Sequence, residues 1–199
     1  MNLTPTICVC LASIVLTAQP VAAQHHDGKS MQNYLPGVSA TTTPPSPYAD
    51  MAQRRVKALS DQQMGDLKAG HGMSLALAAE LNGYPGPLHV LELANALRLS
   101  DQQRSRTNEL IEAMKAEAIP IGEAIIAEET TLDRWFSEGR ITRESLAAAV
   151  SRIGAAQGEL RAAHLRYHLV MVEVLSPDQI ALYAKLRGYA EGRDRTQEQ

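Results

Sequence analysis

The chain has 199 residues and a formal net charge of −3, and this length predicts one domain with tails. Hydrophobic residues make up 45% of the chain but aromatic residues only 4%, and Ala and Leu dominate the apolar set. This composition favours helices packed through small aliphatic side chains over a sheet. The mildly acidic balance provides no basic field for nucleic acid, so we expect no nucleic-acid partner.

Residues 1–23 have the pattern of a secretory signal peptide. An apolar run from Ile7 to Ala18 leads to Val21-Ala22-Ala23, a small-residue pattern typical of a cleavage site. The segment departs from the usual pattern in having no Lys or Arg before the run. The run is shorter than the roughly 20 residues that a membrane-spanning helix needs. We therefore expect secretion with cleavage, and an uncleaved membrane anchor is the alternative.

The predicted signal peptide, called the leader below, would be absent from the mature chain. Both cysteines, Cys8 and Cys10, lie inside it, so a mature chain would have no disulfide and no thiolate metal site.

Residues 24–47 are polar and rich in Pro and Thr, which predicts a disordered linker. His25 and His26 near its start are candidates for weak transition-metal binding, and the alternative is an unstructured polar tail.

From residue 48 to residue 190 the pattern is that of an all-helical domain, and residues 191–199 form a charged tail. We expect helices, in chain order, over residues 49–69, 73–82, 87–98, 101–138, 142–174 and 177–190. Gly70-His71-Gly72 should separate the first two, and Gly139 should end the longest. Pro120 predicts a bend near residues 116–120, because proline removes a helical hydrogen bond.

Three boxes of the form Leu-Ser-x-x-Gln each predict the start of a helix, at residues 59–63, 99–103 and 175–179. In such a box Ser is the N-cap, and Gln three residues later completes a capping box. The leucine before the cap can pack on the fourth helical residue as a hydrophobic staple. That residue is Met64 in the first box, Ile180 in the third, and the polar Arg104 in the second.

The helix predicted over Thr142–Val174 carries a heptad seam. Its seam positions are Leu146, Val150, Ile153, Gln157, Leu160, His164, Tyr167, Met171 and Val174. The seam predicts a long helix packed lengthwise on another helix, so residues 101–138 and 142–174 should form an antiparallel hairpin. A hairpin this thin cannot bury both faces, so we expect a homodimer or an exposed apolar surface.

The order of these features resembles the periplasmic Spy/CpxP superfamily, whose hallmark is a pair of Leu-Thr-x-x-Gln motifs. It also resembles the heavy-metal-resistance branch of that superfamily, the CnrX and ZraP types. The boxes at residues 99–103 and 175–179 match with Ser in place of Thr, and the resemblance spans residues 59–189. The chain departs from the pattern in two ways. Its charge is mildly acidic where Spy-type cradles are basic, and residues 70–98 have no counterpart.

The resemblance implies a periplasmic, non-catalytic stress protein built as a cradle-shaped dimer of helical hairpins. One role that it implies is binding of metal ions, either to report or to buffer them. The other is ATP-independent chaperoning of unfolded periplasmic proteins. A third alternative is an inhibitory docking partner of a membrane sensor kinase. Sequence motifs of enzymes, such as a Gly-rich phosphate loop, a His-Glu-x-x-His helix or a G-x-S-x-G elbow, do not occur.

His164, His168 and Met171 are the candidate metal ligands. The two histidines are four residues apart, so they lie about one helical turn apart on one face, a common geometry for Zn, Ni, Co or Cu. Met171 is two turns from His164 and could add a thioether for copper. Counting back from the turn at residues 139–141 places His164 opposite Met114 and Glu117, which makes a fourth ligand conceivable.

The alternative interpretation gives these residues a structural role. In it His164 hydrogen-bonds across the seam to Gln157 or a carboxylate, fixing the register of the hairpin, while His168 is a solvated flank. His71 in its glycine turn and His89 on an apolar helix are weaker candidates, because neither has the three or four convergent groups that a metal site needs.

Overall fold

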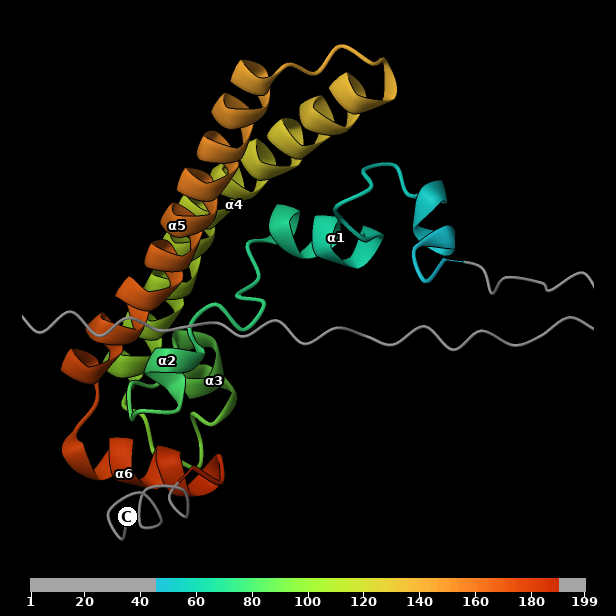
Figure 1. The fold of residues 1–199 in the computed structure, drawn as a ribbon. Coiled ribbons are helices and arrows are strands. Elements are labelled where there is room, and N and C mark those ends of the chain that lie inside the picture. Colours follow the sequence, from blue (N-terminus) through green and yellow to red (C-terminus); the bar gives the residue numbers. More distant parts are fainter. Residues whose placement is uncertain (1–45, 190–199) are drawn as a thin grey trace, which may run out of the picture. The chain divides into compact units, whose positions relative to one another are not determined.

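The computed structural model describes residues 46–189, and this part of the chain is all-α, as predicted (Figure 1). Its elements are the 3-10 helix η1 (Ala49–Gln53) and the helices α1 (Asp61–Ala69), α2 (Leu77–Glu80), α3 (Pro87–Glu92), α4 (Asp101–Ser137), α5 (Arg143–Val174) and α6 (Pro177–Leu186). The predictions made for the leader, for most of the linker and for the charged tail lie outside the described residues. No helix within residues 46–189 is both long and apolar enough to cross a membrane.

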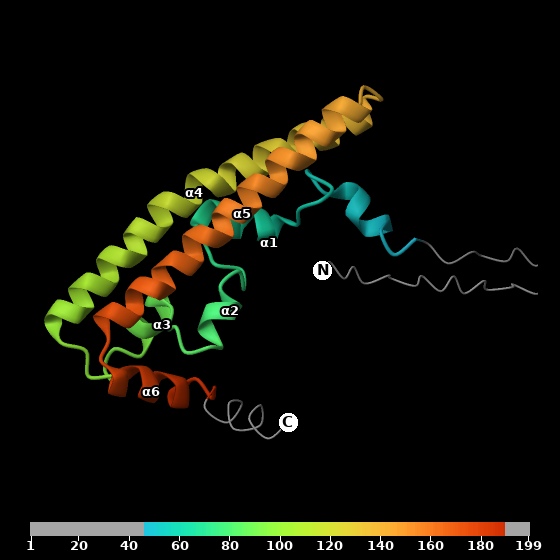
Figure 2. The same cartoon turned by 60° about the vertical axis from the view of Figure 1, so that its left-hand side comes forward.

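The long helices α4 and α5 pack antiparallel as a hairpin, which confirms the predicted centre of the fold (Figures 1 and 2). Gly139 takes the left-handed conformation, with φ of 63°, in the turn that joins them. Helix α4 continues through Pro120, and its green and yellow halves run in different directions in Figure 2. That change of direction agrees with the bend that a proline inside a helix predicts.

Shorter helices pack on the hairpin and divide its core in two. Helix α1 and the turn before it pack on α4 around Met64, Leu67 and Ile125. At the open end of the hairpin, α3 and α6 enclose a second cluster that contains Val90, Met171, Leu175 and Tyr183. The stretch from residue 70 to residue 98 therefore connects the two clusters and lies along the hairpin between them.

All three Leu-Ser-x-x-Gln boxes form the predicted capping boxes. In each, the serine side chain accepts from the glutamine backbone N–H, and the glutamine side chain accepts from the serine backbone N–H. Leu59 and Met64 lie in one apolar cluster, and Ile180 packs against the cluster that contains Leu175, as the staples predict. Thr142 and Ser145 form a fourth capping box that the sequence pattern did not indicate.

The second and third boxes are also bonded to each other. The Gln103 amide donates to Gln179 Oε1 at 2.9 Å, and the Gln179 amide donates to Gln103 Oε1 at 3.1 Å. Each amide makes a further bond to a backbone carbonyl, Gln103 to Val174 and Gln179 to Leu97. The two boxes thus hold the first turn of α4 against the first turn of α6.

The buried stripe of α5 differs from the predicted heptad seam near the turn. Leu146 and Val150 are 38% and 53% exposed, and Gln157 is exposed as well. Ala149 and Ala163 are fully buried instead. A straight α-helix drifts about 20° per heptad relative to a 3.5-residue repeat, so a stripe that follows the seam at one end of a long helix leaves it at the other.

Several predicted helices are shorter than expected. The pattern over residues 49–69 resolves into η1 and α1, because Ser60 caps a new helix. The helix predicted over residues 73–82 is reduced to α2, since Met73 and Ser74 have φ of 42° and 65°. Helix α3 ends at Glu92 and α6 at Leu186, before the predicted ends.

Candidate functional site

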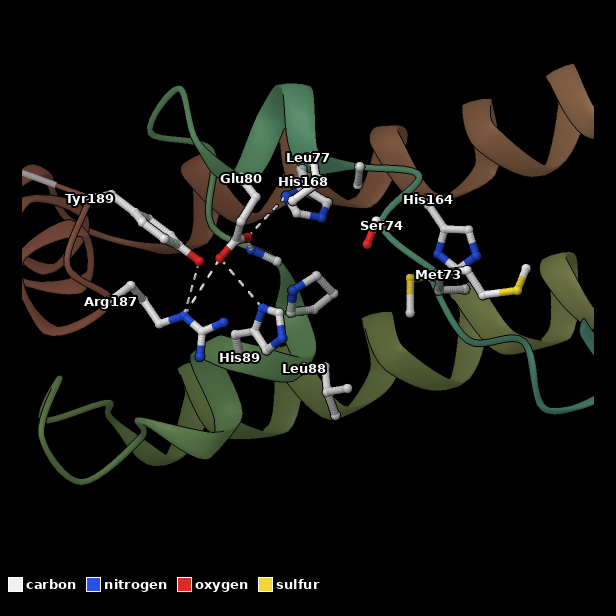
Figure 3. Close-up of a pocket in the computed structure, with 15 residues that line it drawn as sticks. Met73, Ser74, Leu77, Glu80, Leu88, His89, His164, His168, Arg187 and Tyr189 are labelled. Carbon is white, nitrogen blue, oxygen red and sulfur yellow. Dashed lines mark hydrogen bonds and ion pairs between the residues drawn. The ribbon is translucent and has the colours of Figure 1, made fainter. Parts of the chain in front are cut away.

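A cavity of about 340 Å³ opens between the segment that carries α2 and α3 and the hairpin (Figure 3). Its lining comes from six parts of the chain, of which the first three are consecutive and the others are distant in sequence. They are the loop around Met73, helices α2 and α3, α4 through Met114, α5 through His164 and His168, and Arg187 after α6. The cavity therefore combines apolar walls with a few convergent polar groups, the usual makeup of a binding site.

A buried carboxylate, Glu80, lies at the α6 end of this cavity and is 5% exposed. The Tyr183 hydroxyl donates to its Oε1, and the Gly86 backbone N–H donates to its Oε2 at 3.1 Å. Arg187 Nε lies 3.8 Å from Oε1 and His89 Nδ1 lies 3.4 Å from Oε1 (Figure 3). Glu80 thus joins α2, α3 and α6 in one polar network.

Tyr183 is held in this network as a hydrogen-bond donor. It is 1% exposed. Burial and then the hydrogen bond to Glu80 raise the pKa of its hydroxyl well above the usual value for tyrosine. The phenol therefore stays protonated at neutral pH and keeps donating to the carboxylate.

His168 is buried and is fixed by a backbone carbonyl. Its Nδ1 lies 2.7 Å from the carbonyl oxygen of Tyr84, so Nδ1 carries a proton, because a carbonyl only accepts. Glu80 Oε2 lies 3.7 Å from the same nitrogen. The other side of the ring lies against Gly86, where a Cβ atom would come within 3.0 Å of Nε2. The interpretation of His168 as a solvated flank is therefore wrong.

His164 is 2% exposed, and its Nε2 has no hydrogen-bond partner within residues 46–189. Burial, and after it the nearby His168, lower the pKa of His164, and the carboxylate of Glu117 opposes them. The imidazole is therefore neutral at pH 7 and has a lone pair available. The structural interpretation has His164 hydrogen-bonded to Gln157 or a carboxylate, but Gln157 is exposed and Nε2 has neither as a partner among residues 46–189.

The structure separates the three predicted metal ligands. His164 and His168 line one cavity, but Met171 lies outside it, fully buried in the apolar cluster with Val90 and Tyr183. Met114 lines the cavity with His164, as the register of the hairpin predicted. Glu117 pairs with Arg166 at 2.9 Å.

The weaker candidates have other partners. His71 is exposed, and its Nδ1 lies 2.8 Å from Asp66 Oδ1, a contact that lowers the pKa of Asp66. His89 Nδ1 lies 3.4 Å from Glu80 Oε1. In the part of the chain that the structure describes, no three His, Cys, Asp or Glu side chains are grouped as a metal site.

Comparison of the chain with protein-family models, curated proteins and solved structures gave no match. The resemblance to the Spy/CpxP superfamily therefore rests on the two boxes and the predicted hairpin. Function has to be argued from the cavity itself.

Two groups in the cavity were not predicted from the sequence, Met73 and the Glu80 network. Glu80 ends a short Ala/Leu helix, where an acidic residue normally faces solvent. Met73 follows the Gly70-His71-Gly72 break, a pattern that by itself predicts only the end of a helix. That break was the available signal, because glycines around a polar residue often let a loop return over a site.

Proposed function

We propose that this protein is a non-catalytic, metal-binding protein of the cell envelope, related in function to the heavy-metal-resistance branch of the Spy/CpxP superfamily. The observation that carries the proposal is the buried, unpartnered Nε2 of His164 at a cavity that His168 also lines. A buried polar atom without a partner costs free energy. A bound transition-metal ion would supply the missing partner and remove that cost.

His164 is suited to this role by its protonation. Metal ligands must be deprotonated at the binding nitrogen. His164 is neutral because burial lowers its pKa. His168 lines the same cavity, but its Nδ1 donates to a carbonyl and its Nε2 lies against Gly86, so His164 supplies the ligand nitrogen. The leader-like sequence of residues 1–23 supports placing the protein in the periplasm.

Saturating metal is expected to raise the melting temperature of the protein, and His164→Leu should abolish the rise. Ligand at 100 times its dissociation constant stabilises the folded state by about 2.7 kcal/mol, which corresponds to roughly 5–10 °C in a chain of this size. Thermal unfolding should be followed with and without Zn, Ni, Co and Cu.

His71→Ala is the matched control, because His71 is an exposed histidine outside the cavity. It should keep the full rise. His164→Leu should leave the metal-free protein as stable as wild type or more so. Leucine has a volume similar to that of histidine, and it removes a buried nitrogen that has no hydrogen-bond partner. A metal-free protein strongly destabilised by His164→Leu, or a rise that survives it, would contradict the proposal.

Binding of unfolded protein is a second candidate function, favoured by apolar side chains that α2, α3 and the turn between them expose. Leu77, Leu81, Tyr84 and Leu88 are 39–50% exposed. Neighbouring apolar groups of this kind mark interaction surfaces.

Replacing Leu77, Leu81 and Leu88 together by Ser should abolish suppression of client aggregation, if the segment binds unfolded chains. Light scattering of a heat-denatured client at equimolar protein measures this. The control is Phe136→Ser with Val150→Ser, which removes exposed apolar groups near the turn of the hairpin. Failure of the wild-type protein to suppress aggregation at tenfold excess would eliminate the chaperone role.

A further inference from the structure

Two thioether side chains line the cavity together with the unpartnered imidazole of His164. They are Met73, from the loop before α2, and Met114, from α4. Figure 3 shows the His164 ring beside the segment that carries Met73. One imidazole and two thioethers from three different elements therefore line the same cavity.

The backbone that carries Met73 is held in an unfavourable conformation. Met73 and the next residue, Ser74, both have positive φ, 42° and 65°. Non-glycine residues in this region are strained, and such residues cluster at binding sites. Directly before them, a Cβ atom on Gly72 would lie 3.7 Å from His164 Nδ1. The loop therefore lies in van der Waals contact range of the Nδ1 edge of the imidazole.

The nearby carboxylates are not placed to join His164 in the cavity. Glu80 accepts hydrogen bonds from Tyr183 and Gly86, and Glu117, which pairs with Arg166, is not among the residues that line the cavity. Among residues 46–189 no group of three His, Cys, Asp or Glu meets the geometry of a metal site. Hard or borderline ions that need several nitrogen and oxygen ligands are thus poorly served by this cavity.

The remaining ligand types select one class of ion. Thioethers are soft ligands that favour Cu(I), and imidazole suits copper as well as Zn, Fe and Ni. Copper is the metal that both ligand types share. A neutral set of one imidazole and two thioethers also matches a monovalent ion better than a divalent one, because it offers no negative charge to balance the ion.

We propose that Met73, Met114 and Nε2 of His164 form a site for a soft monovalent ion, Cu(I), and that Met171 is not a ligand. This inference rests on the proposed metal-binding function and specifies its metal and its sulfur ligands. Met171 is a core residue, fully buried against α3 and α6. The sulfur ligands come instead from the loop and from α4.

The test measures Cu(I) affinity of the chain with Cys8→Ser and Cys10→Ser, because these two thiols would otherwise bind the ion themselves. It is made under anaerobic, reducing conditions, in competition with a chromophoric Cu(I) chelator. His25→Ala and His26→Ala should be present in all samples, to remove the histidine pair near the N-terminus. We expect one Cu(I) per chain. Met73→Leu with Met114→Leu should weaken it by at least about 100-fold, since losing even an outer partner of a metal ligand costs about 10- to 100-fold.

Met171→Leu is the control, because it removes a thioether of the core and keeps its volume. It should leave the Cu(I) affinity unchanged. X-ray absorption of the copper-loaded protein should show sulfur bonded to copper, and the sulfur signal should disappear in the Met73/Met114 variant. Circular dichroism and the melting temperature of each metal-free variant show whether it is folded.

The outcomes separate this inference from the proposed function. If Zn, Ni or Co binds through His164 and Cu(I) does not, metal binding stands and the copper site is wrong. If Cu(I) binding survives loss of both cavity thioethers, or is lost with Met171→Leu, the assigned sulfur ligands are wrong. If no metal binds, both proposals fail.

Discussion

Replacing Glu80 by alanine is expected to lower the free energy of unfolding by about 2–6 kcal/mol. The Tyr183 hydroxyl and the Gly86 N–H both donate to this buried carboxylate. Without it, both donors stay buried without an acceptor, at about 1–3 kcal/mol each. Urea unfolding measures the change, and an unaltered dependence on urea would show that the folded and unfolded states are otherwise unchanged.

Two variants calibrate that result. Glu92→Ala removes an exposed acidic residue from the end of α3, and it should change stability by no more than about 0.5 kcal/mol. Glu80→Gln keeps one acceptor oxygen and should lie between the other two. Stability of Glu80→Ala within the range of Glu92→Ala would show that the network contributes little to folding.

Replacing Gly122 by alanine is expected to destabilise the protein by about 3 kcal/mol, the upper end of the cost of overpacking. A Cβ atom on Gly122 would lie 2.4 Å from the carbonyl oxygen of Leu67 and 2.9 Å from its carbonyl carbon. These are backbone atoms of α1, so no side-chain rotation can relieve the clash. Helix α1 would have to move away from α4.

Gly158→Ala on α5 provides a control of the opposite sign. Gly158 is exposed, and no atom would lie within 4 Å of its Cβ. Alanine in an open helical position stabilises by about 0.5–1 kcal/mol relative to glycine. Thermal or urea unfolding of the two variants should therefore shift in opposite directions. Destabilisation by both would mean that loss of glycine, rather than contact with α1, is the cause.

The helix starts were predictable because local chemistry decides them. Ser60, Ser100 and Ser176 cap helices at the predicted residues, since each box satisfies its own backbone N–H groups within four residues. The register of the hairpin was also accessible. Once the turn near Gly139 is fixed, counting along two antiparallel helices places Met114 opposite His164.

The rest of the cavity was not predictable in this way. Glu80 and Tyr183 are 103 residues apart in the chain, and no periodic pattern links an Ala/Leu helix to the last helix. Met73 is placed by positive φ values in a loop, and the hydrophobic periodicity of helices cannot predict such a conformation. Sequence reasoning therefore placed His164 opposite Met114, but it grouped Met171 with His164 because the two residues share a seam.

The glutamine pair has a consequence for how the box motif should be interpreted. Gln103 and Gln179 each use two donors and two acceptor positions within the pair and its neighbouring backbone. Glutamate lacks the donors and asparagine the length, so a change in one box leaves the other with unmet bonds. Gln63, whose box has the same five residues as that of Gln103, bonds within its own helix start and makes no further side-chain bond to the rest of residues 46–189. A single box therefore indicates only the start of a helix. Two boxes whose glutamines are 76 residues apart indicate that the two helix starts are bonded to each other.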